Sequence, residues 1–100
     1  MVRHVILWKI KEEKTAEEKE QIKVNVKKGL EGLAGQIPGL VEIKVQAESL
    51  ASSTADVMLD STFTDEATLK AYAIHPAHVE VADNYVRPFM EIRMCLDFEA

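Results

Sequence analysis

The chain has 100 residues, enough for a single domain over residues 1–100 with a modest hydrophobic core. Apolar residues make up 47% of the chain and charged residues 29%, as in ordinary globular proteins, and the formal net charge of −5 disfavours nucleic-acid binding. The longest early apolar run, Val5 to Trp8, is too short for a membrane span or a secretory leader, so we expect a cytoplasmic protein without membrane attachment.

The first predicted elements are a strand and a long helix. The strand covers Val2 to Ile10, and Val5 and Leu7 lie on the face opposite the even-numbered residues. Thr15 followed by Glu18 predicts a capping box at the start of the helix. Apolar residues then recur at three- and four-residue spacing, at Ile22, Val26, Leu30 and Leu33. Gly35 is the expected end of this helix.

Two further strands are expected after the tight turn at Ile37-Pro38-Gly39. Alternation of apolar and polar residues predicts a strand from Leu40 to Ala47, and a second apolar pattern runs from Ala55 to Phe63. The polar segment Glu48 to Thr54 joins them. Such a short connection favours an antiparallel pair.

The second half of the chain predicts two short helical stretches and a last strand. Thr64 is the expected cap of the first stretch, which carries Tyr72 and is interrupted at Pro76. The second stretch covers roughly His78 to Arg87. The last strand, from Met90 to Phe98, alternates apolar and polar residues throughout.

The predicted order is therefore βαββαβ. This order is typical of an α+β, ferredoxin-like fold with a four-stranded antiparallel sheet and its helices on one face. The other face of the sheet would meet water, although the first strand and Met58 place apolar side chains on it. We therefore expect a homodimer that forms through this open sheet face.

Cofactor signatures are missing from the sequence. There is no glycine-rich phosphate loop, dinucleotide fingerprint or Cys-x-x-Cys pair, so no nucleotide or flavin cofactor is expected. The single cysteine, Cys95, is expected to be a reduced, inert thiol. The three histidines with Glu80 and Asp83 lack a regular ligand spacing, and no metal site is predicted.

Four segments together resemble the stress-responsive A/B barrel (Dabb) family over nearly the whole chain. They are Met-Val-Arg-His-Val-Ile-Leu-Trp at the amino end, Ile37-Pro38-Gly39, Tyr72-Ala73-Ile74-His75-Pro76-Ala77-His78-Val79, and Leu96-Asp97-Phe98-Glu99. The resemblance implies a dimeric α+β barrel in which two sheets face each other and the helices lie outside. The wider superfamily includes monooxygenases, decarboxylase-like enzymes, haem-degrading enzymes and binding proteins, so the fold leaves the activity open.

The Tyr72 to His78 segment also resembles plant polyketide cyclases of the olivetolic acid cyclase type. In those enzymes the matching tyrosine and second histidine are regarded as catalytic, which makes Tyr72 and His78 the candidate catalytic residues here. Candidate pocket residues elsewhere in the chain differ from that branch, so its substrate is not carried over.

Pro76 gives the candidate pair a physical basis, because a broken helix allows Tyr72 and His78 to converge on one cavity. A neutral imidazole can remove a proton beside a carbonyl, and a tyrosine hydroxyl can stabilise the resulting enolate. In the competing interpretation His75 fixes the loop, His78 caps a helix and Tyr72 belongs to the core.

A pocket between sheet and helices is expected to bind a small apolar or aromatic molecule. The substrate-binding candidates are His4, Trp8, Phe63, His75 and Phe89. Small-molecule binding is the expected function. The alternatives are a cofactor-independent, polyketide cyclase-like lyase or isomerase that uses the Tyr-His pair, and a cofactor-independent monooxygenase. The sequence leaves open whether any reaction follows binding.

Overall fold

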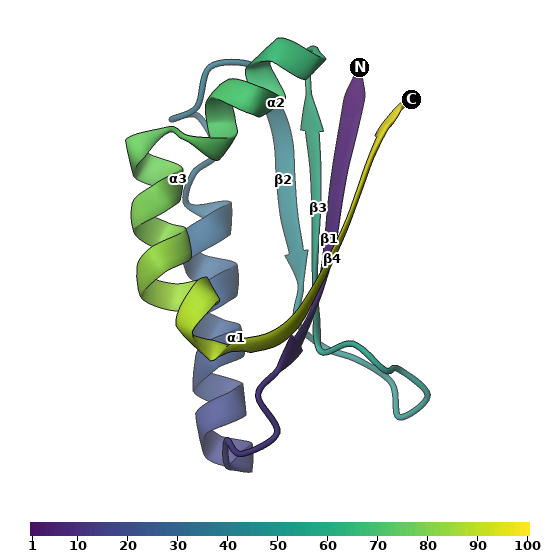
Figure 1. The fold of residues 1–100 in the computed structure, drawn as a ribbon, viewed down its shortest axis with the longest axis vertical. Coiled ribbons are helices and arrows are strands. Elements are labelled where there is room, and N and C mark those ends of the chain that lie inside the picture. The colour runs from purple at the N-terminus through teal and green to yellow at the C-terminus, as the bar shows by residue number, and fades with distance from the viewer.

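The computed structural model describes all residues from Met1 to Ala100 and confirms the predicted βαββαβ order. The strands pair antiparallel in the order β2-β3-β1-β4, and the helices cover one face of the sheet (Figure 1). The elements are β1 (Val2–Ile10), α1 (Ala16–Glu31), β2 (Leu40–Gln46), β3 (Val57–Phe63), α2 (Glu66–Ala73), α3 (Pro76–Val81), the π-helical turn η1 (Ala82–Val86), the 3-10 turn η2 (Arg87–Phe89) and β4 (Met90–Glu99). No helix combines the length and the apolar character needed to cross a membrane.

The side of the sheet that faces the helices is apolar in β1 but polar in the neighbouring strand β4. Val2, Ile6 and Trp8 of β1 are buried against the helices. Directly opposite them in the pairing register stand polar residues of β4: Trp8 faces Arg93, for example. Paired residues share a face of the sheet. The polar side of β4 therefore turns toward the helices, and its apolar side turns toward the open face.

The open face carries the exposed apolar side chains of the sheet. Met94 and Leu96 are 66% and 64% exposed, and they pair with Leu7 and Val5 of β1. Ile92 and Phe98 lie on the same side of β4 and are also exposed. The sheet thus presents a contiguous apolar surface that the helices of the same chain do not cover.

The capping box of α1 is confirmed, but the predicted helix end is wrong. The Thr15 hydroxyl accepts a hydrogen bond from the Glu18 amide at 3.1 Å, and the Glu18 carboxylate accepts one from the Thr15 amide at 2.9 Å. The helix ends at Glu31, and Gly35 lies in the following turns with a φ of +79°. The apolar spacing continued past the end because Leu33, in a tight turn, is still buried in the core.

Two corrections also apply to the helices before β4. Asp65 rather than Thr64 caps α2, because its carboxylate accepts the Thr68 amide hydrogen at 2.8 Å. The next helix, α3, begins at Pro76 and not at His78, since proline suits the first position of a helix. The predicted interruption itself is confirmed: His75 is extended, with φ −65° and ψ 131°.

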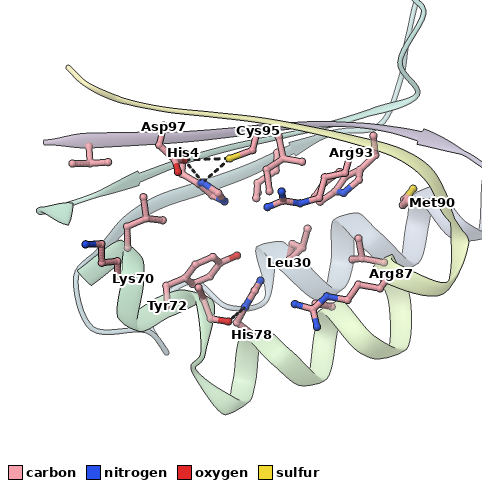
Figure 2. A pocket seen from close by; sticks show the side chains of 18 of the residues that line it. His4, Leu30, Lys70, Tyr72, His78, Arg87, Met90, Arg93, Cys95 and Asp97 are labelled. Carbon is pink, nitrogen blue, oxygen red and sulfur yellow. Dashed lines mark hydrogen bonds and ion pairs between the residues drawn. The ribbon is translucent and has the colours of Figure 1, made fainter. Parts of the chain in front are cut away.

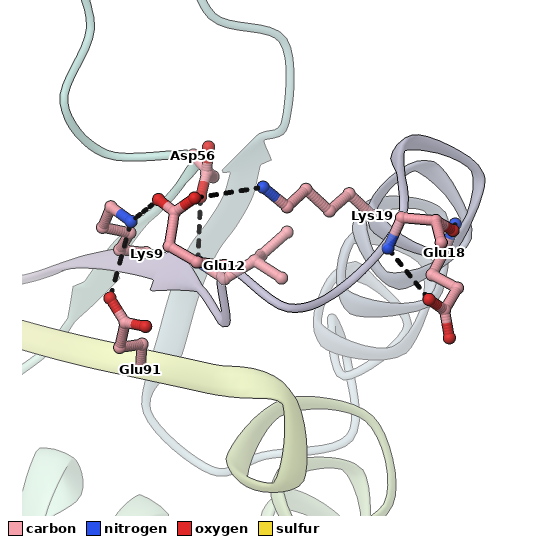
Figure 3. Close-up of polar contacts among 8 residues, drawn as sticks. Lys9, Glu12, Glu18, Lys19, Asp56 and Glu91 are labelled. Atoms are coloured by element: carbon pink, nitrogen blue, oxygen red, sulfur yellow. Dashed lines mark hydrogen bonds and ion pairs between the residues drawn. The ribbon is translucent and has the colours of Figure 1, made fainter.

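Polar contacts hold the far end of β1 to its neighbours (Figure 3). The Lys9 ammonium contacts Glu12 and lies 3.5 Å from Glu91 at the start of β4. Asp56, which precedes β3, accepts the Ile10 amide hydrogen at 2.8 Å. Exposed ion pairs add little to stability. We therefore assign the Lys9–Glu91 contact to positioning β4 beside β1, and the Asp56–Ile10 hydrogen bond to positioning the start of β3.

Gly39 lies where the turn before β2 meets the start of α2. Its φ is +82°, its carbonyl oxygen accepts the Thr64 amide hydrogen at 2.9 Å, and a Cβ at this position would lie 2.4 Å from the Cβ of Thr68. Gly35 has a similar φ of +79°, but a Cβ there would have no neighbour within 4 Å. A side chain at position 35 would therefore meet backbone strain alone, whereas one at position 39 would meet both backbone strain and a steric clash with Thr68.

We predict that Gly39→Ala lowers the free energy of unfolding by about 3 kcal/mol, and Gly35→Ala by about 1 kcal/mol. Both alanines adopt a left-handed backbone conformation, but only the alanine at position 39 pushes against α2. Urea denaturation of the two variants and the wild type measures the difference. Equal losses would contradict the close approach of Gly39 to Thr68.

Candidate functional site

A cavity of about 760 Å³ lies between the helix-facing side of β1 and β4 and the helical layer of α2, α3 and η1 (Figure 2). Its volume is in the range of small-molecule sites. Apolar side chains of β1, including Ile6 and Trp8, form part of its wall, and Leu69, Ala82 and Val86 line it from the helices. The polar side of β4 completes the lining.

Tyr72 reaches this cavity from α2. Its ring packs against Phe63 with 4.9 Å between ring centres, and the residue is only 2% exposed. The hydroxyl is buried and has no hydrogen-bond partner in the protein. Burial raises the pKa of Tyr72, an effect that the positive charge of Arg93 partly opposes. Tyr72 is therefore a protonated donor whose hydrogen bond is available to a ligand.

His78 meets Tyr72 across the helix break. The ring centres lie 4.1 Å apart, although a continuous helix would place residues six positions apart on different sides. His78 Nδ1 is 3.3 Å from the Ala73 carbonyl oxygen. A carbonyl oxygen only accepts hydrogen bonds, so Nδ1 carries the proton and Nε2 keeps its lone pair.

The surroundings of His78 favour its neutral form. Burial lowers the pKa of its imidazole; the hydrogen bond to Ala73 opposes this shift, and the charges of Arg87 and Arg93 add to it. A neutral imidazole with a free Nε2 can accept a proton. The site therefore combines a proton acceptor with the Tyr72 donor.

His4 forms a second polar group on the sheet side of the cavity. It is 7% exposed and its Nδ1 is in direct hydrogen-bond contact with the Asp97 carboxylate, its partner in the β1–β4 register. The Cys95 thiol lies 3.7 Å from His4 Nδ1 and donates to Asp97 at 3.4 Å. Burial is the largest of the effects that raise the pKa of Cys95, which favours the protonated thiol.

His4, Cys95 and Asp97 also have the donor types of a transition-metal site. Their donor atoms lie within 4.8 Å of one another. The sequence had directed attention to Glu80 and Asp83 instead. A direct hydrogen bond between imidazole and carboxylate is shorter than the separation of two ligands around one zinc ion. We therefore assign the three residues to a hydrogen-bonded cluster that orients the His4 ring.

The structure brings together four of the residues that the sequence singled out: Tyr72, His78, His4 and Trp8 all line the cavity. Three other candidates do not line it. Phe63 is fully buried behind the ring of Tyr72. His75 turns to its own helix, where Nδ1 accepts the Ala77 amide hydrogen at 3.1 Å. Phe89 lies in η2, with the Lys14 ammonium 5.7 Å from its ring centre.

Sequence reasoning missed the polar residues that β4 contributes: Arg93, Cys95 and Asp97 all line the cavity. Their alternation was visible, but the side that faces the helices depends on the pairing register with β1. One signal was available in the first strand. Val5 and Leu7 showed that the open face is apolar near β1, which favours the apolar side of β4 lying on that same face.

Comparison with known proteins agrees with this architecture. A dimeric protein of unknown function from Bacteroides fragilis with a ferredoxin-like fold is 29% identical, covers 99% of this chain and 95% of its own, and superimposes with a TM-score of 0.93. A dimeric ferredoxin-like protein from Thermobifida fusca is 24% identical, with coverage of 99% and 90% and a TM-score of 0.78. The hydroxynitrile lyase of Passiflora edulis is 20% identical, with coverage of 97% and 90% and a TM-score of 0.70.

The Thermobifida and Passiflora proteins are less than 25% identical to this chain, so their likeness establishes the fold alone. No match is found among curated proteins. Residues 2–100 match the family described as Stress responsive A/B Barrel Domain, the family that the sequence segments resembled. The chain therefore belongs to the stress-responsive A/B barrel (Dabb) family.

Proposed function

We propose that the protein binds a small carbonyl compound in the cavity and catalyses proton transfer at the carbon next to the carbonyl, without a cofactor. The observation that carries this proposal is the buried, unpartnered hydroxyl of Tyr72 beside the His78 ring in one cavity. A protein that only bound an apolar ligand would need neither group there.

The reaction that we propose assigns one role to each residue. His78 Nε2 takes the proton from the carbon, and the electron pair of the C–H bond moves toward the carbonyl oxygen. The Tyr72 hydroxyl donates a hydrogen bond to the enolate oxygen that forms. Return of the proton to another atom gives an isomerase, and attack of the enolate carbon on a second carbonyl gives an aldol-type cyclisation. Both outcomes balance without an added oxidant.

Burial supports this division of roles. It keeps Tyr72 protonated and His78 neutral at the same pH, because it disfavours the charged form of each group. His4, fixed by Asp97, offers a further polar contact from the opposite wall. The hydroxynitrile lyase fold relative likewise acts on a small molecule, but its low identity leaves the chemistry here to the residues of this site.

We also infer that the protein works as a homodimer joined through the open face of its sheet. The Bacteroides and Thermobifida relatives are dimeric. On this chain the exposed side chains of Leu7, Met94 and Leu96 lie on that face, and burying them against a second copy would remove apolar surface from water. The cavity lies on the other face and would stay accessible in such a dimer.

For the enzymatic role, we predict that the wild type accelerates exchange of the α-protons of 2-tetralone in D2O, followed by proton NMR. His78→Ala should slow the protein-dependent exchange by at least about 100-fold and Tyr72→Phe by roughly 100-fold, the usual effects of losing a general base or an oxyanion donor. His75→Asn is the matched control, because its side chain lies outside the cavity and asparagine preserves the helix cap. Exchange that persists in His78→Ala would refute the assigned base.

The buried hydroxyl of Tyr72 also predicts a gain in stability when it is removed. Tyr72→Phe should raise the free energy of unfolding by about 1 kcal/mol, because an unsatisfied polar group no longer has to be buried. Urea denaturation measures the change, with Tyr85→Phe at a partly exposed tyrosine as the control that should stay near the wild type. A clear loss of stability in Tyr72→Phe would mean that the hydroxyl has a partner in the folded protein.

For the dimer, we predict that Met94→Glu weakens association at least about tenfold, because it would bury a carboxylate in an apolar interface. Sedimentation equilibrium measures the monomer–dimer constant. Val24→Glu makes the same kind of change at an exposed position of α1 and should leave the constant unchanged. A wild-type monomer, or an unaltered dimer of Met94→Glu, would contradict association through this face.

A further inference from the structure

Arg93 is a cavity residue that the proposed reaction does not use. It projects from the polar side of β4, opposite Trp8, and Figure 2 shows its guanidinium turned into the space toward which Tyr72 and His78 point. The other two arginines each form an ion pair, Arg3 with Asp60 and Arg87 with Asp83. Arg93 forms none, so a charged guanidinium faces the cavity without an anionic partner.

The acidic residues nearest to Arg93 are already engaged elsewhere. Asp97 is held by His4, and Glu91 lies 3.5 Å from the Lys9 ammonium. Glu99 also lines the cavity, but it stands six residues along β4, roughly 20 Å away at the rise of a β-strand. The Cys95 thiol, two residues along the strand, is a polar neighbour of the guanidinium, which has five N–H donors and so keeps donors available to a molecule in the cavity.

The charge of Arg93 also influences Tyr72 and His78, the two residues of the proposed reaction. Its positive charge lowers the pKa of both Tyr72 and His78, which places the guanidinium in the same electrostatic environment as the proposed donor and base. A ligand that reached Tyr72 and His78 with its carbonyl group could therefore extend another group toward Arg93.

We propose that Arg93 binds a carboxylate of the ligand, so that the site selects carbonyl compounds that carry a single negative charge. This inference rests on the proposed function in one respect: it assumes that the ligand whose carboxylate contacts Arg93 also places its carbonyl group at Tyr72 and His78. A guanidinium presents paired N–H donors that match the two oxygens of a carboxylate. The carboxylates of Asp97 and Glu91 also line the cavity, so they repel a dianion such as a phosphate monoester more strongly than a ligand with one negative charge.

The apolar wall assists this selection. Trp8 lies opposite Arg93 in the sheet and lines the cavity, so a flat, apolar body can pack beside it while the carboxylate contacts the guanidinium. A ligand that displaces water from this part of the cavity strengthens the charge-assisted hydrogen bond. An aromatic carboxylate therefore combines both features that the site offers.

The test compares 2-naphthoate with 2-naphthamide, two compounds of nearly the same shape that differ in charge, by isothermal titration calorimetry at neutral pH. The wild type should bind the carboxylate at least about tenfold more tightly, as expected for a hydrogen bond to a charged group. In Arg93→Gln this preference should disappear through weaker binding of naphthoate, with naphthamide little changed. Arg93→Lys keeps the charge without the paired donors and should retain part of the preference.

Lys28→Gln is the matched control, because it removes one positive charge at an exposed position of α1 that does not line the cavity. It should keep the wild-type preference. Equal affinity of the wild type for the two compounds, or a preference that survives Arg93→Gln, would overturn the role of Arg93 while leaving the Tyr72–His78 proposal intact. Failure of the wild type to bind either compound would also overturn the role of Arg93, and the exchange assay tests the Tyr72–His78 proposal separately, so loss of proton exchange alone would leave carboxylate binding standing.

Discussion

The helix that carries Tyr72 cannot continue through Pro76, and the candidate site depends on this interruption. Proline lacks the amide hydrogen that the helix needs and forces His75 into an extended conformation. The chain then starts a new helix at once, and the Tyr72 and His78 rings meet with 4.1 Å between their centres. The same interruption turns the His75 side chain back onto the new helix as its cap.

The antiparallel register of β4 with β1 supplies the other half of the site. It places the polar side of β4 against the cavity and its apolar side on the open face, so that one alternating strand serves both a candidate ligand site and a candidate subunit interface. Asp97 holds His4 across this register, and Arg93 stands opposite Trp8. The two sides of one strand thus connect the proposed selectivity of the cavity with the proposed dimer.

Burial lowers the stability of the proposed site and at the same time suits the proposed chemistry. A buried hydroxyl without a partner costs free energy, and such sites persist where a ligand uses the unpaired group. Desolvation also keeps the Tyr72 phenol and the His78 imidazole in their neutral forms. The donor and the acceptor are therefore both ready before any ligand enters the cavity.

Much of this structure was predictable from local patterns in the sequence. The strand alternation, the Thr15 capping box and the break at Pro76 depend on neighbouring residues, and all three predictions are confirmed. The family resemblance directed attention to Tyr72 and His78, which the structure places in one cavity.

The features that the sequence did not predict depend on contacts between distant segments. The orientation of Arg93 follows from strand pairing, and the burial of Phe63 behind Tyr72 follows from how α2 packs on the sheet. The end of α1 was misplaced because Leu33 remains buried in a tight turn beyond the helix. Periodicity alone does not distinguish a buried turn from another helical turn.

The most direct test of the Tyr72–His78 pair is the titration of the histidine rings by long-range proton–nitrogen NMR correlation, from about pH 5 to 8, where imidazoles change charge. We expect His78 to be neutral at pH 7 with its proton on Nδ1, and its pKa to lie below the ordinary 6.5 because its ring is partly buried. A proton on Nε2, or a pKa at or above the ordinary value, would contradict the claim that His78 offers a free Nε2 to the cavity.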